Sequence, residues 1–225
     1  MNNITEQQQK DLEGLWNSLQ ARHTGLISYP VWQYLQGQNV EALLDYREKF
    51  IGDIKLASSL EEKVPQVAFA VRDSEGNLVN ILTLELDGLL LLASVGKRYR
   101  LISSKASIAG ASVHFGEPDK VLGLAVSVES AMALVIATGA PCWACLGATG
   151  LRSFQVPERV REVRIFSDVE PSGVMEEASL SLSHRLQAMG HTVTVNTPPC
   201  AALGLSGKVG WHDAWMVAGT EMLRL

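Results

Sequence analysis

The sequence of 225 residues has only three cysteines, too few for a framework of disulfide bonds. We therefore expect the chain to work in a reducing compartment, the cytoplasm. No apolar run reaches the roughly 18 residues needed to cross a bilayer. The polar start of the chain also lacks the basic and apolar regions of a secretory signal. These absences predict a chain without a membrane partner.

Positive charge is scarce as well. The chain has 19 Lys and Arg residues against 24 Asp and Glu residues, a formal net charge of -5. This balance argues against a general nucleic-acid coat protein. The basic residues are unevenly spread, however, and one group forms a basic island: Lys97, Arg98, Arg100 and Lys105. From charge alone, a solvated loop is the favoured interpretation of this island.

Several common sites are missing. The sequence has no glycine motif of the kind that cradles phosphates, and its five histidines show no paired spacing. Cys142 and Cys145 have the spacing of a zinc or redox pair, but they lie in an apolar, strand-like run without further ligands at matching distances. We expect buried structural cysteines there, and no zinc site.

The N-terminal part is predicted to mix helices and strands. Leu12, Leu15 and Trp16 have the spacing of one helical face, and further short helices are predicted over 30–35 and 40–50. Two strand-like runs, 67–71 and 78–86, flank a turn at 73–76 and predict an antiparallel hairpin. We assign residues 1–118 to a small α+β subdomain.

The pattern changes at residue 121. Apolar strands are predicted over 121–126, 141–146, 162–167 and 191–196, with helices over 129–138 and 173–189 between them. Strands that alternate with helices and are apolar on both faces are typical of a parallel sheet covered by helices. Residues 119–225 are therefore predicted to form an α/β domain.

Acidic residues are placed where such sheets carry function, at the carboxyl ends of strands. Asp168 and Glu170 follow the strand over 162–167, and Glu129 starts the helix after the first parallel strand. Clustered carboxylates there suit Mg²⁺, which prefers oxygen ligands. An equally supported alternative is that these side chains only cap or favour helix N-termini.

Three stretches resemble the Toprim superfamily, the catalytic domain of topoisomerases and primases. They are Leu124 to Ala133, Ala137 to Leu151 and Val163 to Gly173, which includes Asp168-Val-Glu-Pro-Ser-Gly. Gly210-Trp-His-Asp213 is similar to an element that follows the last strand of the family. The N-terminal helices and hairpin resemble those of primases from phages, plasmids and other mobile elements. The resemblance implies a Toprim-like sheet preceded by a primase-like N-terminal subdomain.

The resemblance also implies site residues, with departures. Such enzymes hold Mg²⁺ or Mn²⁺ on carboxylates, here Asp168, Glu170 and Asp213, and the catalytic candidates are Glu129, Asp168 and Glu170. The principal catalytic glutamate of the family corresponds to Val126, and the glycine after it to Ser127. Replacing that glutamate by valine removes a metal ligand and a proton-transfer group together.

In primases of this type, the groove for template and nucleotide is basic. The resemblance assigns nucleic-acid binding to the basic island and to Tyr99, a ring on which a base could stack. The set is Lys97, Arg98, Tyr99, Arg100 and Lys105.

Three hypotheses follow. The favoured one is a primase-like Toprim protein of a mobile element, with weakened or lost catalysis, that binds single-stranded DNA, nucleotides or a replication partner such as a helicase or polymerase. The second is an active Mg²⁺-dependent primase. The third is a Toprim nuclease, which the primase-like N-terminal part makes the weakest.

Overall fold

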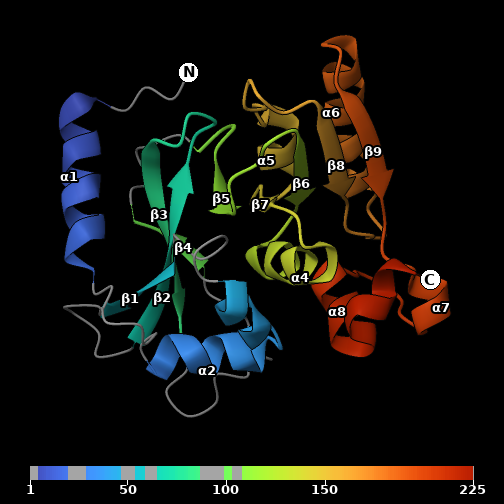
Figure 1. Cartoon of the computed structure of the whole chain (residues 1–225), viewed down its shortest axis with the longest axis horizontal. Helices are drawn as coiled ribbons and strands as arrows, with labels where there is room; N and C mark the ends of the chain where they lie inside the picture. The colour runs from blue at the N-terminus through green and yellow to red at the C-terminus, as the bar shows by residue number, and fades with distance from the viewer. Residues whose placement is uncertain are drawn as a thin grey trace. The chain divides into compact units, whose positions relative to one another are not determined.

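Figure 1 shows the computed structural model of the chain, which describes residues 5–19, 29–46, 54–58, 65–86, 99–102 and 108–224. The chain divides into two compact units, one drawn from Met1–Glu41 and Asp53–Ile108, the other from Ala42–Gly52 and Ala109–Leu225. The second unit starts earlier than the predicted boundary at 118/119. It includes the strand β5 (Ser112–Phe115) because β5 pairs with β7 (Cys142–Ala144).

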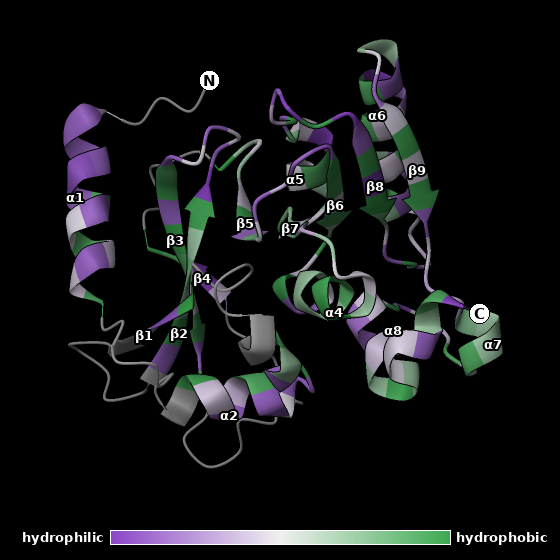
Figure 2. Ribbon diagram, in the orientation of Figure 1, coloured by the Kyte–Doolittle hydropathy of each residue, from purple (hydrophilic) through white to green (hydrophobic). Residues whose placement is uncertain are grey.

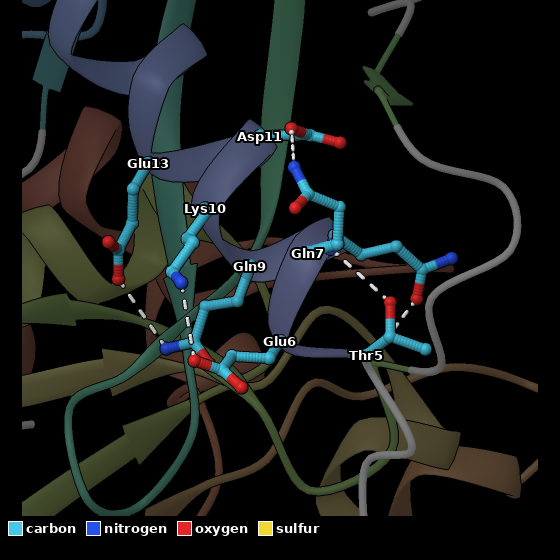
Figure 3. Close-up of polar contacts among 8 residues, drawn as sticks. Thr5, Glu6, Gln7, Gln9, Lys10, Asp11 and Glu13 are labelled. Carbon is cyan, nitrogen blue, oxygen red and sulfur yellow. Dashed lines mark hydrogen bonds and ion pairs between the residues drawn. The ribbon is translucent and has the colours of Figure 1, made fainter.

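The first unit opens with helix α1 (Glu6–Ser18), and its start is fixed by a capping box. The Thr5 hydroxyl accepts a hydrogen bond from the backbone N–H of Gln8, whose side chain accepts one from the backbone N–H of Thr5. Leu12 and Trp16 are buried against β2 and β3. Figure 3 shows the polar side chains that pair one turn apart on the exposed surface: Gln7 with Asp11, Gln9 with Glu13, and Lys10 with Glu6.

The sheet of this unit is antiparallel. Its described strands run in the order β1 (Ile54–Ser58), β2 (Pro65–Arg72), β3 (Leu78–Glu85) and β4 (Tyr99–Leu101). Between β2 and β3 the Asp73 carboxylate accepts hydrogen bonds from the backbone N–H groups of Glu75 and Asn77. Gly76 there has a φ of 90°, which glycine adopts at little cost. Helix α2 (Tyr29–Gly37) contacts β1 and β2.

The second unit holds a mostly parallel sheet in the order β5-β7-β6-β8-β9. Here β6 (Val121–Ala125), β7, β8 (Glu162–Phe166) and β9 (Thr192–Asn196) are parallel, and β5 is antiparallel to β7. The central β6 is almost wholly buried and hydrophobic (Figure 2). The predicted α/β sheet is confirmed.

Helices surround this sheet. In chain order they are α4 (Val128–Thr138), α5 (Ala148–Ser153), α6 (Val174–Ala188), α7 (Cys200–Leu203), α8 (Trp211–Ala218) and the 3-10 helix η2 (Gly219–Leu223). One hydrophobic cluster joins β6, β7 and β8 to α5 and α6. Its members include Leu122, Leu124, Val126, Trp143, Leu151, Ile165 and Leu182.

The long elements agree with the sequence, and the short ones differ. The helix predicted over 40–50 is a 3-10 helix over Glu41–Tyr46 (η1), and residues 47–50 lie outside the described residues. The sequence patterns did not predict β1, β4, β5, α5, α7 or α8. These elements have between three and eight residues, too few for a hydrophobic period to stand out.

Within the part of the chain that the structure describes, no helix is both long and apolar enough to cross a membrane.

Candidate functional site at the strand ends of the second unit

Asp168 lies two residues after β8 and is almost completely buried, with 7% of its surface exposed. Its Oδ1 atom has no hydrogen-bond partner. The pKa of Asp168 is raised to about 7, mainly by burial. The charges of Asp213 and Glu170 contribute to the rise, whereas the charge of Lys208 and the backbone N–H of Trp211 oppose it. Asp168 is therefore a carboxyl group with a perturbed pKa, the usual mark of a functional or strained position.

The other two predicted metal ligands cap helices. Glu170 Oε1 accepts a hydrogen bond of 3.2 Å from the backbone N–H of Met175, in the first turn of α6. Asp213 Oδ2 accepts one of 2.7 Å from the backbone N–H of Gly210, the residue before α8. The sequence left open whether carboxylates here cap helices. Capping is observed, but by Glu170 on α6 rather than by Asp168.

The loops that carry these residues are joined to each other. Val169 and Val209 form an antiparallel bridge with backbone hydrogen bonds of 2.9 and 2.8 Å. The rings of Phe166 and Trp211 meet edge to face at 5.3 Å between centroids. The structure thus joins the loop that carries Asp168 and Glu170 to the segment that leads into α8 and Asp213.

Val126 follows β6 directly, at the position where the resemblance implies a catalytic glutamate. It is buried in the hydrophobic cluster of this unit, and its carbonyl accepts a hydrogen bond from the backbone N–H of Gly147. Glu129 lies in the first turn of α4 and is 2% exposed. The end of β6 therefore offers an apolar side chain where such an enzyme would present a carboxylate.

Helices α4 and α8 lie side by side (Figure 1) and are joined by hydroxyl groups. Ser127 caps α4 by accepting from the backbone N–H of Ser130, and its hydroxyl donates to the Ser130 hydroxyl at 3.0 Å. Ser130 Oγ in turn accepts from the backbone N–H of His212 at 3.2 Å. The sequence did not predict the hydrogen bond between His212 and Ser130, or the charge of Lys208 near Asp168. The residues of each pair are far apart in the chain, and no local sequence pattern indicates that they meet.

The basic island belongs to the first unit and is only partly visible. Lys97, Arg98 and Lys105 lie outside the described residues. Tyr99 and Arg100 form part of β4, and Arg100 makes an ion pair of 3.4 Å with Glu85. The assignment of these five residues to nucleic-acid binding stays a prediction.

The cysteines of the Cys-x-x-Cys spacing are both buried in or just after β7. Burial raises the pKa of the Cys142 thiol well above its usual value, and that of Cys145 in the same direction. A neutral thiol is a poor nucleophile. These residues pack the core.

The donors at Asp168 fall short of a magnesium site. Asp168 Oδ1 is a buried oxygen that could bind a cation, and one oxygen each of Glu170 and Asp213 accepts a backbone hydrogen bond. Among the described residues, no three His, Cys, Asp or Glu side chains form a group that could hold a metal ion. The assignment of Asp168, Glu170 and Asp213 as ligands of Mg²⁺ or Mn²⁺ stays a prediction.

Comparison with known proteins agrees with this architecture. Residues 121–221 match the family described as "Toprim domain". No curated protein matches the sequence.

Three solved structures share the fold. The primase fragment of the bacteriophage T7 primase-helicase protein has a TM-score of 0.52 and 12% identity, over 85% of this chain and 67% of that one. A DnaG primase catalytic domain bound to single-stranded DNA has a TM-score of 0.60 and 13% identity, over 96% of this chain and 76% of that one. The DnaG catalytic core has a TM-score of 0.56 and 13% identity, over 96% of this chain and 77% of that one. At such low identities the likeness shows the fold.

Proposed function

We propose that this chain, whose residues 121–221 form a Toprim domain within a fold like that of primase catalytic domains, is a primase-related replication protein of a mobile genetic element. In this proposal primer synthesis is weakened or lost. The chain acts in the cytoplasm by binding single-stranded DNA, nucleotides or a replication partner such as a helicase or polymerase.

The observation that carries the proposal is Val126. Phosphoryl transfer in this fold depends on carboxylates that hold a metal ion and move a proton. Val126 can do neither, and it is buried in the hydrophobic cluster of the second unit. Glu129, one helical turn further on, is itself buried in α4. Losing such a group commonly costs several orders of magnitude in rate.

Binding is supported by the fold and by charge. One of the solved structures with this fold is bound to single-stranded DNA. Residues 91–120 hold five basic and two acidic residues in a chain of formal net charge -5. A basic segment within an acidic protein restricts contact with phosphates to one region, and Tyr99 adds a ring for stacking.

Fluorescence anisotropy with a labelled DNA oligonucleotide tests this binding across salt concentrations. We expect Arg98→Ala and Lys105→Ala to weaken binding and to lower the salt slope by about one for each lost phosphate contact. Lys10→Ala, which removes an exposed lysine of α1, is the matched control and leaves both unchanged. Wild-type protein that binds neither DNA nor nucleotide would refute this part of the proposal and leave only a protein partner.

Primer synthesis separates the proposal from the active-enzyme alternative. The protein is incubated with single-stranded template, ribonucleotides and Mg²⁺ or Mn²⁺, and the reaction is repeated with Asp168→Ala. We expect no products beyond the level of the variant. Robust synthesis that Asp168→Ala abolishes would establish an active primase.

A further inference from the structure

We infer that the carboxylate corner, defined as Asp168, Glu170 and Asp213, is a structural lock: hydrogen bonds hold its loops and helix starts together, and no metal ion is needed. The lock holds the starts of α6 and α8 in place through hydrogen bonds. This role concerns the stability of the free chain and goes beyond the proposed function, which concerns binding and primer synthesis.

Both helices of the corner begin at a glycine. The N-cap residue of α6 is Gly173 and that of α8 is Gly210, and neither has a side chain that could accept a hydrogen bond. The first backbone N–H groups of a helix need such an acceptor. Glu170 supplies one to Met175, and Asp213 supplies one to Gly210. One oxygen of each of two carboxylates that the resemblance assigns to a metal ion therefore accepts a hydrogen bond from the backbone.

The two loops of the corner are also joined directly. Val169 and Val209 exchange two backbone hydrogen bonds, of 2.9 and 2.8 Å. The carboxyl group of Asp168 lies against Gly210, where an added Cβ atom would come within 3.2 Å of Oδ1. Because the bridge joins the two loops through their backbones, no cation is needed to hold them together.

A third connection reaches the end of β6. The backbone N–H of His212 donates to Ser130 Oγ, and Ser130 is tied to the N-cap Ser127 of α4. The start of α8 is thus attached to the helix that follows Val126, again through hydrogen bonds. Each of the three links is made by groups within the chain.

Thermal unfolding of the full chain tests the inference, first with a chelator and then with millimolar Mg²⁺ or Mn²⁺. We expect the same Tm within about 1 °C in all three conditions. A specific site near saturation would raise Tm by roughly 5 °C or more, because an ion that binds only the folded state stabilises it. A rise of that size in the wild-type protein, absent in Asp168→Asn, would overturn the inference.

Substitutions of Glu170 distinguish a role as helix cap from a role as metal ligand. Glu170→Ala removes the acceptor and should lower Tm by about 2–4 °C, equally with chelator and with ions. Glu170→Gln keeps an amide oxygen that can accept from Met175 and should retain most of the wild-type Tm. If Glu170→Ala fails to fold, Glu170→Gln and the wild-type ion titration still decide the question.

Two further results would contradict the lock. One is a Tm of Glu170→Ala equal to that of the wild type. The other is an ion-dependent Tm in the wild type that both Glu170 variants lose. Neither readout involves primer synthesis or DNA binding, so the lock and the proposed function fail by different observations.

Discussion

At the scale of single residues, Asp168 couples the fold to pH. Its pKa is about 7 in the folded chain, raised from an ordinary value of 3.8 mainly by burial. Between these two values the folded state holds a proton that the unfolded state has released. The contribution of Asp168 to stability is therefore fully present below about pH 4 and is lost as the pH rises through about 7.

The first prediction follows from this sign. From about pH 5 to about pH 8, the wild-type protein should lose stability relative to Asp168→Asn, by an amount on the order of a few kcal/mol. The asparagine variant cannot ionise and removes this part of the pH dependence. Thermal unfolding of both proteins at the two pH values measures the difference. A gap in Tm that stays constant would show that Asp168 does not titrate in this range.

Val126 gives the second prediction at this scale. Val126→Ala should cost about 2 kcal/mol, since it removes two methyl groups from a packed cluster. Val126→Glu should cost more, because its carboxyl group would enter the same apolar surroundings without a partner. Urea unfolding of both variants gives the comparison. A glutamate variant as stable as the wild type would show that the end of β6 accepts a carboxylate, and would remove the main support for lost catalysis.

At the scale of elements, the close approach of α5 to the segment that follows β7 leaves no room for a side chain at one position. A Cβ atom at Gly150 of α5 would lie 1.6 Å from the backbone carbonyl oxygen of Cys145. The helix therefore requires glycine at this position. By contrast, a methyl group added at Gly14 of α1 would have no neighbouring atom within 4 Å.

The third prediction uses this matched pair of helical glycines. Gly150→Ala should destabilise the chain strongly, by roughly several kcal/mol, because the clash is with backbone that must shift. Gly14→Ala should stabilise it by about 0.5–1 kcal/mol, through a higher helix propensity. Unfolding midpoints of the two variants measure both effects. Equal effects of the two substitutions would contradict this packing of α5.

The elements also show which parts of the structure were predictable. The strands β6, β8 and β9 are apolar or β-branched runs, the helices α4 and α6 are long, and the sequence placed these elements closely. The sequence also placed Asp168 at a strand end, since an α/β alternation fixes which loops meet there. It could not show that Glu170 caps α6, because that depends on Glu170 reaching the backbone N–H of Met175 in three dimensions.

At the scale of the whole molecule, we assign different roles to the two units. Residues 121–221 of the second unit match the Toprim domain family, and strand β6 of this unit is followed by a valine. The first unit carries the basic island that we propose for DNA. The formal net charge of -5 is therefore an average that includes the basic segment over 91–120.

The fourth prediction is that the chain makes no primers by itself, and one measurement tests it most directly. Wild-type protein, Asp168→Ala and Glu129→Ala are incubated with single-stranded template, labelled ribonucleotides and Mg²⁺ or Mn²⁺, and products are resolved on a denaturing gel. We predict the same background in all three lanes, because Val126 supplies neither a metal ligand nor a proton-transfer group. Robust primers from the wild type, abolished by Asp168→Ala, would contradict this prediction.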